Sequence, residues 1–368
     1  MTAPHAEGLS VLNSDAEPAP APGAVLLSEI REQPAALRRL LQHEAEYAAV
    51  ARHARRRAPA VVRMVGHGSS DNAASYGVYA FGLLPGWTAT RDSISLSVYY
   101  GAELDLRGSC VVALSQSGQT RDVVDYLERA RRRGAFTIAI TNEPDSALAS
   151  AAEAVLPLAA GRERAIAATK TYTGQVAALA LLAAHAAGDA RAVSDGLRTV
   201  ADLLENLLPV LERRLSEVAV ALAFVGRMFV VGRGLEFATA REISLKLLET
   251  CRVAAEPLTA TALAHGPVAA LDGLFPVWAI ASDDALLPAV RDAAARARAA
   301  RATVLASGPA AAEIEDASYY LPVPKPPTPL LAPVLSVAPG QLLAWALAQA
   351  KGLDPDRPSG LSKVTLAL

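Results

Sequence analysis

SCVVALSQSGQTRDVVDYLERARRRGAFTIAIT, residues 109–141, predicts a strand, a short polar loop, a helix and a second strand in direct succession. The two apolar runs, SCVVALS (109–115) and FTIAIT (136–141), are short and rich in β-branched residues, as strands are. Between them RDVVDYLERARRRG carries apolar residues at helical spacing and ends on Gly134. A further strand is predicted for VVRMVG (61–66). This alternation predicts a parallel sheet with helices on both faces.

The same pattern occurs a second time along the chain. VVGRGLEFATA (230–240) matches MVGHGSSDNAA (64–74) at an offset of 166 residues. Two further strand pairs agree, at offsets of 167 and 166: VALS (112–115) with WAIAS (278–282), and TIAIT (137–141) with TVLAS (303–307). Three successive strand matches at nearly one offset indicate a duplicated domain.

The expected fold class is therefore α/β, with two tandem, doubly wound parallel-sheet domains of the flavodoxin-like kind. The first residues are rich in alanine, proline and acids and lack periodicity, and the last segment, GLDPDRPSGLSKVTLAL, is too polar for a helix. The predicted divisions are a disordered tail over 1–23, a first domain over 24–205, a second domain over 206–350 and a C-terminal tail over 351–368.

Composition excludes several classes of protein. A net charge of -2, from 35 basic and 37 acidic residues, provides no positive field for nucleic acid or for an anionic membrane. Two distant cysteines, Cys110 and Cys251, form no disulfide framework, and the six histidines show no paired spacing for a metal. The N-terminus has no secretory pattern, and the apolar runs are too short or too interrupted to span a bilayer. We expect a cytoplasmic protein without a metal.

Polar side chains follow two of the predicted strands. After VVALS come Ser115, Ser117 and Thr120, whose hydroxyls can surround one phosphate together with the free N–H groups of the following helix. A serine-rich helix cap is the structural alternative. GHGSSDN (66–72) adds Ser69 and Ser70 at a neighbouring strand end, where open parallel sheets bind ligands. A dinucleotide-binding fingerprint would need a third glycine at position 71, which is Asp71, so that signal is weak. The second copy has SDDA (282–285) where the first has its serine loop, so we expect no second phosphate site there.

Three further features could carry proton transfer. In the helix predicted from about Ala240, Glu242, Lys246 and Glu249 lie at i, i+4 and i+7, on one face. Spacing alone favours a surface ladder of ion pairs. A lone histidine beside a turn, such as His265, is more often structural than catalytic, although histidines in general can transfer protons near neutral pH. Lys363 is by default a solvated lysine.

Taken together, these segments resemble the sugar isomerase (SIS) domain family, as in the isomerase half of glutamine-dependent glucosamine-6-phosphate synthase and its stand-alone relatives. The resemblance covers residues 26–368 and rests on the order of these sequence motifs: SEIREQP, GHGSSDNA, SQSGQT, AATKTYTGQ, AREISLKLLE, HGPVAAL and GLSKVT. The chain shows no glutaminase domain, so glutamine is not the expected ammonia source. GSSD, AATK and DPDRPSGLSKVT are similar to the deaminase group, which converts glucosamine 6-phosphate to fructose 6-phosphate and ammonia.

The resemblance implies a role for each matching residue. Glu249 would be the base that moves a proton between C1 and C2, Lys246 would stabilise the enediol-like charge, and Lys363 would cover the site or approach the sugar carbonyl. His265, supplied across a homodimer interface, would open the pyranose ring. The implied substrate-binding residues are Ser69, Ser70, Ser115, Gln116, Ser117, Thr120, Ile166, Ala168 and Ser362. No cofactor is required.

Three alanines depart from the synthase pattern: Ala168 replaces a serine that contacts the sugar, Ala262 a frequent glutamate, and Ala254 a histidine. They leave open a deglycase or an aldose-ketose isomerase for another phosphosugar. A non-catalytic sugar-phosphate sensor is the alternative from a different class. The retained Glu249, His265 and Lys363 favour the enzyme.

Overall fold

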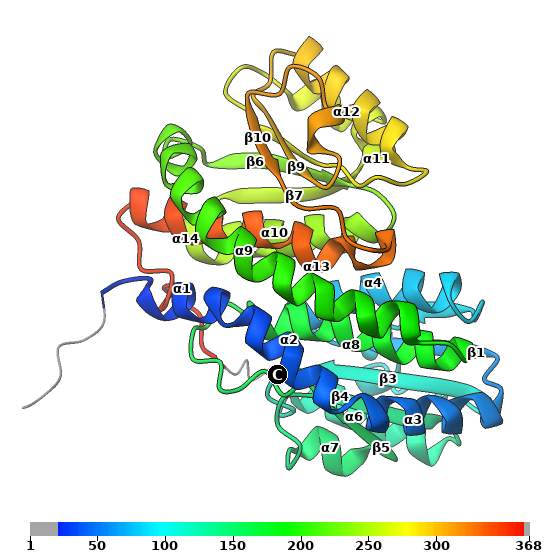
Figure 1. Ribbon diagram of the computed structural model, residues 1–368. Helices are drawn as coiled ribbons and strands as arrows, with labels where there is room; N and C mark the ends of the chain where they lie inside the picture. Colours follow the sequence, from blue (N-terminus) through cyan, green and yellow to red (C-terminus); the bar gives the residue numbers. More distant parts are fainter. Residues whose placement is uncertain (1–20, 364–368) are drawn as a thin grey trace, which may run out of the picture.

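The computed structural model describes residues 21–363 and consists of two α/β units stacked on a shared layer of helices (Figure 1). The predicted tail over 1–23 lies outside the described residues except for 21–23, and so do residues 364–368 of the C-terminal tail. Within the described part, residues 352–363 contain no helix, as their polar, turn-rich composition predicts.

The first unit is built on a parallel sheet with the strand order β2-β1-β3-β4-β5. Its strands are β1 (Val61–Val65), β2 (Ala89–Arg91), β3 (Ser109–Ser115), β4 (Phe136–Thr141) and β5 (Ala154–Pro157). Every residue of β3 and β4 is buried, because helices cover both faces of the sheet. The predicted strands 61–66, 109–115 and 136–141 are confirmed.

The second unit repeats this topology. Its sheet has the order β10-β9-β8-β6-β7. Read from the opposite edge, β7-β6-β8-β9-β10 corresponds strand by strand to β2-β1-β3-β4-β5 of the first sheet. The strands are β6 (Arg227–Gly232), β7 (Ala254–Thr259), β8 (Val277–Ile280), β9 (Val304–Gly308) and β10 (Tyr319–Pro322). Gly68 and Gly234, which correspond at the offset of 166, share an unusual backbone conformation, with φ, ψ of 55°, -125° and 60°, -128°. The predicted pair of tandem doubly wound domains is confirmed.

Helices connect and cover the strands. The first unit contains α1 (Ala24–Arg31), α2 (Gln33–Gln42), α3 (Glu44–Arg57), α4 (Ser69–Leu83), α5 (Ile94–Val98), α6 (Arg121–Arg132), α7 (Ala147–Ala151) and α8 (Lys170–Ala187). Then follow α9 (Arg191–Ala221), α10 (Leu235–Cys251), α11 (Ala260–Ala264), α12 (Leu287–Ala299), α13 (Ala332–Ser336) and α14 (Ala338–Ala350). Short 3₁₀ turns occupy Pro267–Ala270, Ala311–Glu313 and Pro329–Leu331. The helix predicted from about Ala240 begins five residues earlier, because Gly234 makes the turn that starts it.

The helices between the sheets join the two units into one core. α10 packs on α4 of the first unit and on α14, while α9 packs on α2 and α14 (Figure 1). A single buried cluster includes Leu179 of α8, Leu247 of α10 and Leu342 of α14. α9 continues through the division predicted between residues 205 and 206. That division remains a prediction.

One apolar stretch, Pro329–Ala350, is long enough and apolar enough to cross a membrane, but 94% of its most apolar window is buried inside the protein. It packs against α9 and α10 as a core segment. Cys110 and Cys251 are both buried and unpaired, so neither belongs to a disulfide.

The close approach of α14 to α10 gives a test of this core. A Cβ built on Gly340 would lie 2.2 Å from Cγ1 of Ile243, so Gly340→Ala should lower the free energy of unfolding by about 1–3 kcal/mol through overpacking. Gly82→Ala is the matched control, since nothing lies within 4 Å of a Cβ on Gly82. It should raise the free energy of unfolding by up to about 1 kcal/mol, because alanine favours a helix over glycine. Urea unfolding measures both, and an unchanged midpoint for Gly340→Ala would contradict the packing.

Candidate active site

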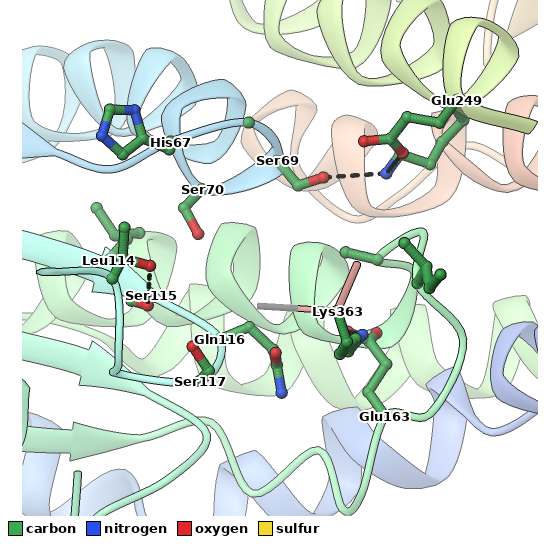
Figure 2. A pocket seen from close by; sticks show the side chains of 15 residues that line it. His67, Ser69, Ser70, Leu114, Ser115, Gln116, Ser117, Glu163, Glu249 and Lys363 are labelled. Atoms are coloured by element: carbon green, nitrogen blue, oxygen red, sulfur yellow. Dashed lines mark hydrogen bonds and ion pairs between the residues drawn. The ribbon is translucent and has the colours of Figure 1, made fainter. Parts of the chain in front are cut away.

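A cavity of about 360 Å³ lies at the carboxyl ends of β1 and β3, facing α10 of the second unit (Figure 2). These adjacent strands are the point where the strand order 2-1-3-4-5 reverses direction, which is where such sheets bind ligands. The cavity is lined by His67, Gly68, Ser69, Ser70, Leu114, Ser115, Gln116, Ser117, Thr120, Glu163, Ile166, Ala168, Lys246, Glu249 and Lys363. Of the residues predicted for the site, all but His265 and Ser362 line it.

The loop from Ser115 to Thr120 is held in a fixed shape by its own hydroxyls. Ser115 Oγ accepts a hydrogen bond from Gly118 N at 3.1 Å and lies 3.3 Å from Thr120 Oγ1. Gly118 has a φ of +61°, and a Cβ on it would lie 2.0 Å from Ser146 Oγ, so only glycine fits there. The loop ends where α6 begins, and Thr120, the N-cap of that helix, lines the cavity. This arrangement suits an anion such as a phosphate group.

The start of α4 forms another side of the same cavity. Gly68 makes the turn after β1, and Ser69 and Ser70 are the first residues of the helix (Figure 2). Gln175 of α8 donates a hydrogen bond to Ser70 Oγ at 2.9 Å, which fixes that hydroxyl. Two helix N-termini, each with a partial positive charge, therefore meet at one cavity.

Glu242, Lys246 and Glu249 form a cluster on the face of α10 that is turned to the first unit. Lys246 Nζ lies 2.6 Å from Glu249 Oε2, 3.5 Å from Glu242 Oε1 and 3.2 Å from Ser69 Oγ. The interpretation as a surface ladder is wrong, because the side chains of Lys246 and Glu242 are only 2% and 0% exposed. Charges buried to this degree are paired.

Burial and charge act against each other in this cluster. Burial by itself lowers the pKa of Lys246, but the carboxylates of Glu242 and Glu249 outweigh it, and the net pKa is raised. Burial raises the pKa of Glu242, against the lowering effects of Lys246 and of a hydrogen bond from Asn72 Nδ2 at 2.8 Å. The cluster therefore holds an ammonium beside Glu249, which is 23% exposed and reaches the cavity.

Lys363 of the C-terminal segment closes the cavity from the side opposite α10. Its Nζ donates to Glu163 Oε2 at 3.1 Å and to the carbonyl oxygen of Ala165 at 2.6 Å. Glu163 is itself held by the N–H groups of Thr169 and Thr171 at the start of α8. Lys363 is thus tied to the wall of the cavity and is not the freely solvated lysine of the default interpretation (Figure 2).

α1 connects this segment with the cavity wall. Asp356 accepts hydrogen bonds from the N–H groups of Val25 and Leu26 at 3.1 and 2.7 Å, capping the N-terminus of α1. One turn further along α1, Glu29 accepts from the N–H groups of Arg164 and Ala165 at 2.5 and 3.2 Å. The segment that carries Ile166 and Ala168 is therefore positioned by a helix more than 130 residues away in sequence.

Sequence reasoning missed two polar residues of the cavity. Glu163 stands in a stretch without a strand or helix pattern, so only its position before AATK could have suggested it. His67 stood in the quoted GHGSSDN loop and was passed over; its Nε2 lies 2.7 Å from Asp122 Oδ2 at the start of α6. Both residues bring charge or a titratable ring to the site.

His265 and Ser362 are the predicted residues that the fold keeps out of the cavity. His265 follows α11 on the second unit and is exposed, and Ser362, beside Lys363, is exposed as well. Among residues 21–363, no group of three His, Cys, Asp or Glu side chains could hold a metal ion.

Comparison with known proteins agrees with this architecture. The SIS domain profile matches residues 43–185. Glutamine–fructose-6-phosphate aminotransferase (isomerizing) of Symbiobacterium thermophilum is 36% identical over 358 residues, which is 92% of this chain and 58% of that relative. The chain thus spans about half the length of the curated relatives it matches.

Two crystal structures extend the comparison. A protein from Silicibacter pomeroyi named as a phosphosugar isomerase shares 33% identity and a TM-score of 0.79, over 90% of this chain and 99% of that one. Glucosamine-6-phosphate deaminase of Thermotoga maritima has a TM-score of 0.77 over 94% of this chain and 100% of that one, and at 21% identity this likeness concerns the fold alone. The Silicibacter protein is 33% identical and is matched over 99% of its length, and the SIS domain profile matches the first unit. The chain therefore belongs to the SIS-domain family.

Proposed function

We propose that this protein is a phosphosugar deaminase/isomerase that converts glucosamine 6-phosphate and water to fructose 6-phosphate and ammonia. The observation that carries the proposal is that one cavity contains both an anion cradle at Ser115–Thr120 and a carboxylate–ammonium pair, Glu249 and Lys246. A phosphosugar needs the first for binding and the second for moving a proton next to its carbonyl group. Membership of the SIS-domain family supports an enzyme of this general kind.

In the proposed reaction the open-chain aldehyde binds with its phosphate in the serine loop. Glu249 removes the proton from C2 and returns it to C1, while the ammonium of Lys246 stabilises the negative charge that develops on the C1 oxygen. The C1 oxygen also takes up a proton and the nitrogen on C2 gives one up, so the product of this shift is an imine at C2 beside a hydroxymethyl group at C1. Water adds to that imine, and ammonia leaves, which gives the ketone of fructose 6-phosphate. Apart from the water that adds to the imine, these steps use side chains of the protein.

Ala168 supports a second candidate within the same chemistry. It lines the cavity with a methyl group, where the synthase pattern has a hydroxyl for the sugar. The missing hydroxyl removes one sugar contact of the synthase pattern, and this leaves open a deglycase or an aldose-ketose isomerase that acts on a different phosphosugar. Purified protein incubated with glucosamine 6-phosphate decides between the candidates: ammonia and fructose 6-phosphate formed in equal amounts support the deaminase. Binding without turnover would instead support the sugar-phosphate sensor.

We also propose a homodimer in which the partner subunit's His265 completes each site and opens the sugar ring. The exposed position of His265 outside its own cavity supports this arrangement. A second cavity of about 480 Å³ adjoins the first, shares Glu249 with it and is bordered by the exposed Leu248 and Leu361. An apolar rim of this kind suits coverage by another subunit. The cytoplasmic location and the lack of nucleic-acid partners remain predictions from composition.

The role of Glu249 can be tested by Glu249→Gln. Loss of the proton shuttle should lower kcat by about 10²- to 10⁴-fold, while the affinity for the phosphosugar, measured by calorimetry, stays within a few-fold because the serine loop is intact. Glu128→Gln, on the exposed face of α6, is the matched control and should retain the wild-type rate. A normal rate in Glu249→Gln would refute the assignment of Glu249 as the base.

Mixing two inactive variants tests the shared site. In a symmetric dimer, random exchange of His265→Ala and Glu249→Gln subunits makes half of the dimers mixed, each with one site that has both residues. Ammonia release should therefore recover to about one quarter of the wild-type rate. Mixtures that stay inactive after verified subunit exchange would argue against a histidine supplied by the partner.

A further inference from the structure

The second copy of the domain contains a buried carboxylate, Glu236, at the place where the first copy has its anion site. Glu236 lies in the first turn of α10, and its side chain is only 1% exposed. At the offset of 166 residues it corresponds to Ser70, which lines the cavity of the first copy. The glycines before the two residues, Gly68 and Gly234, adopt the same backbone conformation, so the two side chains leave equivalent turns.

The partners of Glu236 are hydroxyl groups of the kind that surround the anion site of the first copy. Ser282, the counterpart of Ser115, donates to Oε1 at 2.5 Å, and Ser336 of α13 donates to the same oxygen at 2.8 Å. Thr239, one turn along α10, donates to Oε2 at 2.6 Å. A carboxylate with three donors at the start of a helix is bound as a phosphate oxygen would be.

The space at the second switch point is correspondingly filled. The hollow beside Ser282, Asp283 and Lys325 has a volume of only about 10 Å³, against about 360 Å³ for the cavity of the first copy. Burial raises the pKa of Glu236, while the hydrogen bonds from Ser282, Thr239 and Ser336 oppose that rise. The three hydroxyls thus supply what a buried carboxylate needs in place of water.

We propose that Glu236 is an internal substitute for phosphate: its carboxylate occupies the anion site of the second copy and ties α10, β8 and α13 together. This inference rests on the proposed function, since the first copy must be a phosphate site for the correspondence to apply. The same duplicated turn then serves as a ligand site in one copy and as a structural joint in the other. Removal of the carboxylate should reopen a site for a tetrahedral oxyanion.

Glu236→Ser tests this proposal, because serine is the residue that the first copy has at this position. The variant is made in a Ser115→Ala, Ser117→Ala parent, so that phosphate bound at the first site contributes little to stability. The melting temperature of the variant is then measured at increasing concentrations of inorganic phosphate. The variant should melt below the parent without phosphate and recover with it. At a phosphate concentration ten times its Kd, the ratio of folded to unfolded protein should rise about 10-fold. Potassium chloride of equal ionic strength controls for screening.

Glu236→Gln is the matched control, since its amide fills the same space without a charge and should give the phosphate dependence of the parent. A Glu236→Ser variant with no more phosphate dependence than the parent overturns the proposal. If this variant folds poorly, its refolding yield decides: a yield that rises with phosphate but not with chloride supports the proposal, and a yield indifferent to phosphate contradicts it. Calorimetry of the wild-type chain with phosphate tests the first site separately, so failure of the proposed function can be told from failure of this inference.

Discussion

The burial of the Lys246 ammonium is the constraint on which the arrangement of the two units depends. An unpaired ammonium in that position would cost several kcal/mol, so carboxylates must lie on both sides of it. Glu242 and Glu249 provide them from the same helix, and Glu242 in turn accepts hydrogen bonds from Ser69 and Asn72 of α4. α4, whose first residues Ser69 and Ser70 line the cavity, is thereby connected with the helix that carries the proposed base. A small shift between the units would break the hydrogen bonds from α4 to Glu242, so the distance between the serine loop and the Glu249 carboxylate depends on this interface.

Much of this architecture could be predicted because the information is local. The strands at 61–66, 109–115 and 136–141 can be predicted from their short runs of β-branched residues. The offset of 166 between the two copies can be found by comparing the sequence with itself. The serine loop was identifiable because hydroxyls, a glycine and a helix start occur within six residues. The predicted single phosphate site fits the carboxylate found at the second switch point.

What could not be predicted depends on partners distant in sequence. Spacing on α10 correctly put Glu242, Lys246 and Glu249 on one face, but only the packing of α4 shows that this face is buried. Nothing in the sequence showed which groups Glu163 and Asp356 bind, since both accept hydrogen bonds from backbone N–H groups of other parts of the fold. His265 is a different case, because its own chain places it outside the cavity and its proposed role depends on a second subunit.

The cap that Asp356 places on α1 also bears on how the protein reaches its active form. This bond joins residues 330 positions apart, and Lys363 meets Glu163 across 200 positions. Contacts of such long sequence separation form late, because the loops they close must be ordered first. During synthesis the first unit emerges before Lys246, Glu249 and Lys363 exist, with α1 still uncapped. The sheet and covering helices of the first unit can therefore be made before α10 and the C-terminal segment complete the cavity.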